Sequence, residues 1–231
     1  MPELPEVQAL VDFLGTRLDG LAVTGVDLGS ISVLKTFNPP PQALIGAPVT
    51  GVTRHGKFVD IDCGGTHLIF HLARAGWLRW SDALPQTVIR PGKSPIALRV
   101  RLDDGSGFDL TEAGTRKRLA AYIVNSVADV PGIQTLGPDP LSDDFTLERF
   151  AAILAGQRVQ LKGLLRNQGT IGGIGNAYSD EILHVAKLSP FAIAGSLDDA
   201  TVTRLYAALR DTLSAAVAAA SGKPAAELKP P

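Results

Sequence analysis

The first six residues, MPELPE, place a proline and two carboxylates where most chains carry a frayed end. A Met-Pro start usually loses its methionine because the next residue is small, which would leave Pro2 as a free secondary amine. Such an amine can attack an electrophilic carbon, such as C1′ of a deoxyribose, and form an iminium ion. Glu3 could then supply a proton to the departing group. The same residues also fit a plain helix start, with Pro2 in the first turn and Glu3 and Glu6 at the positive end.

Two further stretches could bind phosphate. Lys57 follows Gly56 in RHGKFVD, at the start of an expected strand, where a lysine could hold a phosphate or protonate a sugar oxygen. In LKGLLRNQGTIGGIGNAYSDEIL, the glycines between 169 and 175 could let the backbone approach a phosphate at a helix N-terminus. Asn176 opens that helix, and Lys162 lies in the preceding one. A solvated strand-end lysine and an ordinary helix–turn–helix are the alternatives for these two stretches.

Hydrophobic periodicity predicts the elements that must position these residues, in an α+β fold. VQALVDFLGTRL is expected to be an amphipathic helix, and KFVDIDCGG with THLIFHL a hairpin. IALRVRLDDGSGFDLTE predicts a second hairpin, so residues 1–130 should form a β-sandwich domain with a leading catalytic helix. Prolines and glycines mark 131–145 as a linker. Residues 146–231 should be a helical domain with four helices and a loose tail, SGKPAAELKPP.

Composition sets broader limits on the class of protein. The chain has 231 residues, 45% of them apolar, which is a globular composition without an apolar run long enough for a membrane span. Its single cysteine, Cys63, excludes an internal disulfide or a multi-cysteine zinc site. A cytoplasmic location is therefore expected, associated with the nucleoid if the source is bacterial. The net charge of -1 argues mildly against a nucleic-acid partner, although basic residues outnumber acidic ones between residues 54 and 118.

Taken together, MPELPEV, HGKF and LLRNQGTIGGIGNAYSDEIL resemble the formamidopyrimidine-DNA glycosylase and endonuclease VIII family. HLARAGWLR and LGPDPLSDDF add to the resemblance, which covers roughly residues 1 to 220. It implies a bifunctional enzyme of base-excision repair with a helix–two-turn–helix motif. The enzyme would remove oxidised bases from damaged double-stranded DNA and cleave the abasic strand by β,δ-elimination. A monomer that does not bind membranes is expected.

The resemblance also implies roles for individual residues. Pro2 would be the Schiff-base nucleophile, Glu3 the acid in base loss and ring opening, and Glu6 a support for the catalytic end of the first helix. Lys57 would contact the phosphate beside the lesion and take part in proton transfer. The DNA-binding residues implied by the match are Asn176, Lys162 and Arg158.

Three departures from the family pattern stand out. Arg74 in HLARAG occupies the place of a methionine that is wedged into the base stack in HLGMSG, and a guanidinium can stack on bases. The family's second wedge, an arginine–arginine–phenylalanine stretch, is also changed. Here the stretch reads TEAGTRKRLA, about two residues longer than in the family, and the wedge can be placed only within Arg116 through Leu119, which includes Arg118. Most members also bind one structural zinc in a C-terminal four-cysteine finger, whereas this chain reads AAELKPP at that point.

No metal or other cofactor is therefore expected in this chain. It is either truncated before the finger or a natural zinc-free member, and weakened catalysis is expected in both cases. Oxidised purines and oxidised pyrimidines both remain candidate substrates. The alternative function is a non-catalytic relative that binds damaged DNA, which the missing finger and altered wedge favour and the intact Pro2, Glu3 and Lys57 oppose. A helix–turn–helix regulator leaves the opening MPE unexplained.

Overall fold

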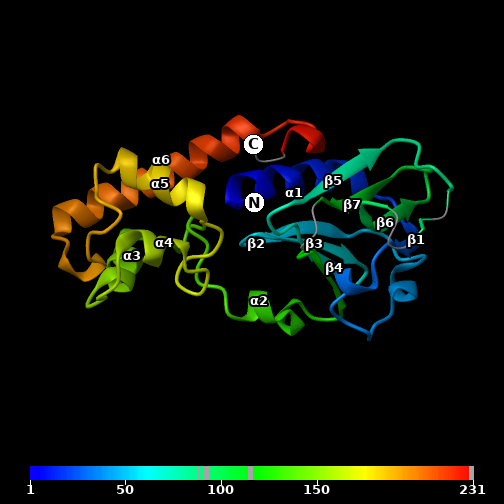
Figure 1. Ribbon diagram of the computed structural model, residues 1–231, viewed down its shortest axis with the longest axis horizontal. Helices are drawn as coiled ribbons and strands as arrows, with labels where there is room; N and C mark the ends of the chain where they lie inside the picture. The colour runs from blue at the N-terminus through cyan, green and yellow to red at the C-terminus, as the bar shows by residue number, and fades with distance from the viewer. Residues whose placement is uncertain (88, 91–93, 114–116, 229–231) are drawn as a thin grey trace.

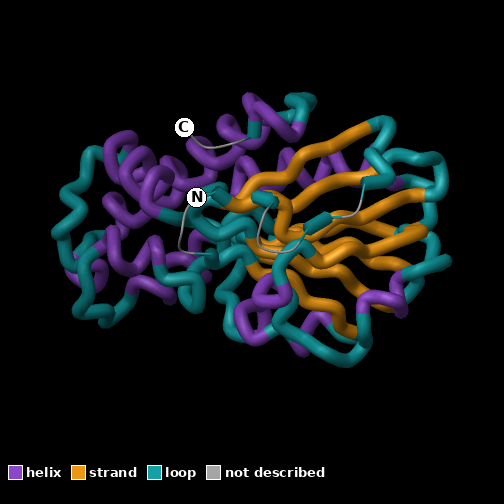
Figure 2. The backbone as a smooth tube through the Cα atoms, turned by 45° about the vertical axis from the view of Figure 1, so that its right-hand side comes forward, coloured by secondary structure: helices purple, strands orange, loops and turns teal. Residues whose placement is uncertain are grey.

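A computed structural model describes residues 1–87, 89–90, 94–113 and 117–228. The strands lie on one side of the molecule with α1 along them, and α3, α4 and α5 lie on the other side (Figures 1 and 2). The α-helices are α1 Leu4–Leu18, α2 Pro131–Gln134, α3 Leu147–Leu154, α4 Leu161–Arg166, α5 Asn176–Val185 and α6 Asp199–Ala220. The strands are β1 Val23–Leu28, β2 Gly51–His55, β3 Phe58–Cys63, β4 Thr66–His71, β5 Gly76–Ser81, β6 Ile96–Leu102, β7 Gly107–Glu112 and β8 Ala120–Val124.

The strands form two four-stranded antiparallel sheets, in the orders β1-β6-β7-β5 and β2-β3-β4-β8. Both predicted hairpins are present, β3 with β4 and β6 with β7. Apolar side chains from the two sheets, among them Phe70, Phe108 and Leu98, meet in one core together with the buried face of α1. The expected α+β architecture, a β-sandwich led by a helix and followed by helices, is therefore confirmed.

The four predicted C-terminal helices correspond to α3, α4, α5 and α6. Thr146 and Asp198 act as N-caps of α3 and α6, because each side chain accepts a hydrogen bond from a backbone N–H in the first turn. Phe145, Phe150 and Leu205 lie at the centre of a second core, which is built from these helices. Among the described residues, no helix combines the length and the apolar character needed to cross a bilayer.

The two cores are tied together by segments that cross between them. Leu4, at the start of α1, is fully buried in the helical core. In the opposite direction, Ala225 and Leu228 follow α6 and are buried in the core of the sandwich, beside β5. The expectation of a loose tail is wrong for residues 225–228, because two apolar side chains in a polar, proline-containing stretch are enough to anchor it.

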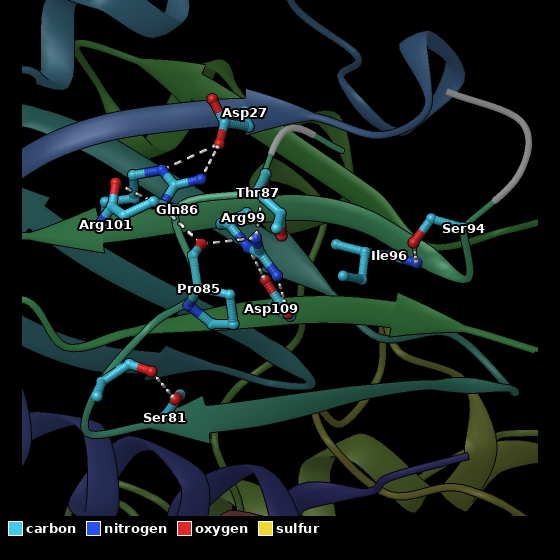
Figure 3. Close-up of polar contacts among 11 residues, drawn as sticks. Asp27, Ser81, Pro85, Gln86, Thr87, Ser94, Ile96, Arg99, Arg101 and Asp109 are labelled. Carbon is cyan, nitrogen blue, oxygen red and sulfur yellow. Dashed lines mark hydrogen bonds and ion pairs between the residues drawn. The ribbon is translucent and has the colours of Figure 1, made fainter. Parts of the chain in front are cut away.

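One polar cluster fixes the connection between β5 and β6 to the outside of the first sheet (Figure 3). The guanidinium of Arg99 forms two hydrogen bonds to Asp109, 2.6 and 2.8 Å long. Its remaining nitrogen donates to the carbonyls of Pro85 and Thr87. Because both charges are buried, the bidentate geometry is what offsets their desolvation. This cluster holds a loop in place and belongs to the scaffold.

Candidate active site

The first turn of α1, which contains Glu6, and the two residues before it, Pro2 and Glu3, lie at the junction of the two cores. The carboxylate of Glu6 accepts a hydrogen bond from the backbone N–H of Glu3 at 2.8 Å. This closes the first turn and caps the helix start. Pro2 is buried and shares the wall of a small cavity of about 10 Å³ with Glu6, Leu72, Trp77 and Leu228. The helix-start interpretation is thus correct for Glu6. It is wrong for Pro2, which precedes the N-cap residue Glu3 and lies outside the first turn, where Pro5 stands instead.

Glu3 is buried, and its carboxylate lies at the N-terminus of α5. It accepts hydrogen bonds from the backbone N–H groups of Gly175, Ala177 and Tyr178, at 2.7, 3.0 and 3.2 Å. Unpaired N–H groups at a helix start attract an anion, and here the anion is a side chain of the same protein. The contact joins residues 172 positions apart in the chain.

The glycine-rich turn before α5 makes this contact possible. A Cβ on Gly175 would lie 2.3 Å from an oxygen of Glu3, and a Cβ on Gly173 would lie 2.8 Å from the Cβ of Leu4. The N–H of Leu4 also donates to the carbonyl of Gly173 at 3.0 Å. The glycines were expected to let this turn approach a phosphate. In the structure they let it approach Glu3 and Leu4 at the start of α1. Asn176, at the start of α5, is exposed to solvent.

Lys57 lies in the turn between β2 and β3, where Gly56 has a φ of 58°. Its side chain is buried, with 6% of the residue exposed. Burial lowers the pKa of Lys57; the charges of Glu3 and Glu6 oppose this shift, and Arg166 adds to it. The solvated strand-end lysine, the alternative considered for this residue, is therefore wrong, and Lys57 lies close enough to Glu3 and Glu6 for their charges to act on it.

His71, at the end of β4, belongs to the same region and was missed in the sequence. Burial, with the nearby charge of Lys57, lowers its pKa to about 4. Its Nδ1 accepts a hydrogen bond from the N–H of Ala73 at 3.0 Å, so the proton of the neutral ring sits on Nε2. The ring is therefore an uncharged N–H donor beside Lys57. A histidine ending a buried strand just before the HLARAG turn was the available signal.

The shift at His71 predicts an acid-sensitive contribution to stability. The folded ring takes up a proton near pH 4, whereas the unfolded ring does so near pH 6.5. The contribution of neutral His71 to the free energy of unfolding is therefore complete above pH 6.5 and is lost as the pH falls toward 4. Between pH 7.5 and pH 5 the wild type should lose about 2 kcal/mol more than His71→Gln in urea unfolding. His184→Gln is the matched control, because His184 is exposed. An equal loss in wild type and His71→Gln would contradict the assignment.

The predicted wedge residues lie on two neighbouring loops. Arg74 is exposed in the β4–β5 turn, whose Ala73 has a φ of 53°, a conformation that favours the glycine of the family pattern. The N–H of Ala113 donates to the carbonyl of Ala75 at 3.3 Å, which brings the β7–β8 loop alongside that turn. Arg118 is exposed in this loop, and its N–H donates to Glu112 at 2.7 Å. Arg116 lies outside the described residues.

The two remaining predicted DNA contacts lie on the helical side. Lys162, in α4, forms an ion pair with Asp180 of α5 at 2.7 Å. This pair partly offsets the charge of the lysine. Arg158 is exposed in the segment before α4.

The residues described here do not suit a thiolate zinc site. Cys63 is 2% exposed within the sandwich core, and burial raises the pKa of its thiol to about 12. Zinc is bound by the thiolate, usually together with other cysteine or histidine ligands. Across the described part of the chain, no group of three or more His, Cys, Asp or Glu side chains could hold a metal ion.

Comparisons with known proteins match both halves of the chain. Residues 1–121 match the model of the formamidopyrimidine-DNA glycosylase N-terminal domain, and residues 136–226 match the model of the formamidopyrimidine-DNA glycosylase H2TH domain. The chain is 34% identical to the formamidopyrimidine-DNA glycosylase of Sphingopyxis alaskensis, covering 95% of this chain and 79% of that protein. It is 33% identical to the enzyme of Symbiobacterium thermophilum, covering 94% and 70% of the two chains.

Solved structures give the same result. The MutM (Fpg) protein of Thermus thermophilus superposes with a TM-score of 0.82 at 29% identity, covering 99% of this chain and 82% of that one. The Fpg (MutM) protein of Lactococcus lactis, in complex with DNA containing an N7-benzyl-Fapy-dG, superposes with a TM-score of 0.83 at 25% identity. That match covers 94% of this chain and 79% of the other.

Proposed function

Because this chain belongs to the formamidopyrimidine-DNA glycosylase family, we propose that it removes oxidised bases from duplex DNA and cleaves the abasic strand through an imine formed by Pro2. One observation supports this most. The N-terminal pair Pro2 and Glu3, Lys57 in the β2–β3 turn and the start of α5 come from three distant parts of the sequence and converge where the two cores meet. Perturbed and buried ionisable groups gathered in this way are typical of catalytic sites.

The chemistry proceeds in balanced steps. After loss of Met1, the nitrogen of Pro2 attacks C1′, and the base leaves with the electrons of the glycosidic bond. The departing base takes a proton from solvent, and the Glu3 carboxylate takes the proton that the Pro2 nitrogen loses. Glu3 passes that proton to O4′ as C1′–O4′ breaks, so the sugar ring opens and an iminium ion remains. Removal of a C2′ proton then expels the 3′ phosphate, and removal of a C4′ proton expels the 5′ phosphate. Water finally hydrolyses the imine and frees the Pro2 amine. Both eliminations draw electrons toward the positive nitrogen, which is why an amine catalyses them.

The cationic side chains hold the DNA during these steps. Lys57 binds the phosphate next to the lesion and takes part in proton transfer, and the neutral His71 offers its Nε2–H to the same backbone. Asn176, Lys162 and Arg158 bind further phosphates from the helical side, and Arg74 and Arg118 fill the space left by the extruded nucleotide. Extrusion itself costs a few kcal/mol, which these contacts offset. A single chain carries every group, so a monomer bound to damaged duplex DNA is sufficient.

Strand cleavage and binding, measured together, test this function. On a duplex with one abasic site, the protein should nick the damaged strand, and on duplexes with one oxidised purine or pyrimidine it should first release the base. Binding without either reaction would instead identify a non-catalytic reader of damaged DNA.

Lys57→Met should slow single-turnover nicking of the abasic duplex by about 10²- to 10³-fold, because a buried proton-transfer and phosphate-binding group is lost. Lys187→Met is the matched control, since exposed Lys187 follows the end of α5 away from Glu3. The role of Lys57 is refuted if both variants nick at the wild-type rate.

A further inference from the structure

The residue that stands out beyond the four catalytic candidates is Tyr178, in the first turn of α5. Its hydroxyl donates a hydrogen bond to one carboxylate oxygen of Glu6 at 2.9 Å. Its backbone N–H donates to Glu3 at 3.2 Å. Tyr178 therefore contacts both carboxylates of the N-terminal motif, although it lies in the other half of the chain.

Glu6 links Tyr178 to the end of the chain. While one oxygen of its carboxylate accepts the Tyr178 hydroxyl, the other accepts the N–H of Glu3 at 2.8 Å. That N–H belongs to the peptide unit formed with the carbonyl of Pro2, so the hydrogen bond holds the peptide to which the Cα of Pro2 is attached. Glu6 and Pro2 also line the same small cavity. A chain of two hydrogen bonds thus runs from α5 to the peptide beside the nucleophile.

The Tyr178 hydroxyl, the donor at the start of these two hydrogen bonds, stays protonated. Burial, followed by the negative charge of Glu6, raises the pKa of Tyr178. The hydroxyl consequently keeps its proton and donates throughout the neutral range. An exposed hydroxyl would exchange this bond with water, but Tyr178 is partly buried against the helical core.

We infer that Tyr178 is a positioning residue, which aims the Pro2 amine at the sugar by holding Glu6 through its hydroxyl. This rests on the proposed function, because it concerns the same imine-forming step. Tyr178 touches neither the nucleophile nor the reacting sugar carbon. Its effect should appear in the rate of imine formation rather than in DNA affinity, since small displacements of a reacting group are costly.

Tyr178→Phe tests the inference with the ring retained. Single-turnover borohydride trapping on an abasic duplex should slow by about 10- to 100-fold, with an unchanged dissociation constant for that duplex. Tyr206→Phe is the matched control, because the Tyr206 hydroxyl makes an equivalent bond, 2.7 Å long, to the carbonyl of Phe145 in the helical core. It should trap at the wild-type rate.

A double-mutant cycle with Glu6→Gln separates positioning from general weakening. If Tyr178 acts through Glu6, adding Tyr178→Phe to Glu6→Gln should cost little more. Full additivity, wild-type trapping by Tyr178→Phe, or an equal loss in Tyr206→Phe would each overturn the inference. A wild-type protein that never traps abasic DNA would overturn the proposed function instead, so the two failures are distinct.

Discussion

Replacing Pro2 with glycine is expected to reduce covalent trapping on abasic DNA by at least about 100-fold. The glycine amine retains a nitrogen but loses the ring, which is buried beside Leu10, Leu72 and Leu78 and fixes the direction of attack. The amine would then sample many orientations. The measurement is reduction by borohydride during incubation with an abasic duplex, which converts the iminium carbon–nitrogen bond to a stable amine.

Pro5→Ala provides the control for this experiment. Pro5 is also buried and lies in the first turn of α1, so its replacement perturbs the same helix end without changing the terminal amine. It should trap at close to the wild-type rate. Mass spectrometry of the intact protein should show that Met1 has been removed. Trapping by Pro2→Gly at the parental rate, or trapping while Met1 is still attached, would refute an attack by Pro2.

The space around Pro2 adds a condition to this chemistry. The cavity of about 10 Å³ has room for one water molecule at most, and a deoxyribose is much larger. Ala225 and Leu228 form part of its wall and come from the segment after α6. That segment is short and held by two apolar side chains, whereas the remaining wall comes from Pro2, α1, the β4–β5 turn and β5. A sugar that reaches Pro2 therefore requires part of this wall to move.

Local patterns in the sequence predicted most of the fold, and long-range contacts explain what they missed. The alternation in β6 and β7 involves residues close in the chain, so periodicity identifies these strands. The anchoring of Leu228 depends on the apolar surface of β5, which no local pattern reveals.

The candidate site divides in the same way. The N-terminal motif and Lys57 were predicted from residue type and family resemblance. The neutral state of His71 follows from burial, and the link from Tyr178 to Glu6 follows from the docking of α5 on α1. Helix α5 was predicted from its own residues, but its packing against the start of α1 was not predicted. Phosphate was the expected anion at its N-terminus, yet Glu3 occupies that position, and only a contact between chain segments could reveal this.

Gly175→Ala should therefore be nearly as damaging as a change in the catalytic residues themselves. The added Cβ would lie 2.3 Å from a carboxylate oxygen of Glu3, which must move away from the N–H groups of α5. Loss of preorganised donors around a catalytic charge typically costs about 10²- to 10³-fold in rate. Base release from an oxidised duplex should fall by that factor in a single-turnover assay, and unfolding free energy should fall by about 1–3 kcal/mol.

Gly163→Ala supplies the contrast, because Gly163 lies inside α4 and a Cβ there meets nothing within 4 Å. Alanine should stabilise that helix by about 1 kcal/mol and leave the rate unchanged. The cause can be isolated further in a Glu3→Ala background, where Gly175→Ala meets no carboxylate and should cost little stability. If Gly175→Ala were equally destabilising with and without the Glu3 side chain, the glycine would serve the turn itself. That result would refute the idea that Gly175 is needed to hold the Glu3 carboxylate at the start of α5.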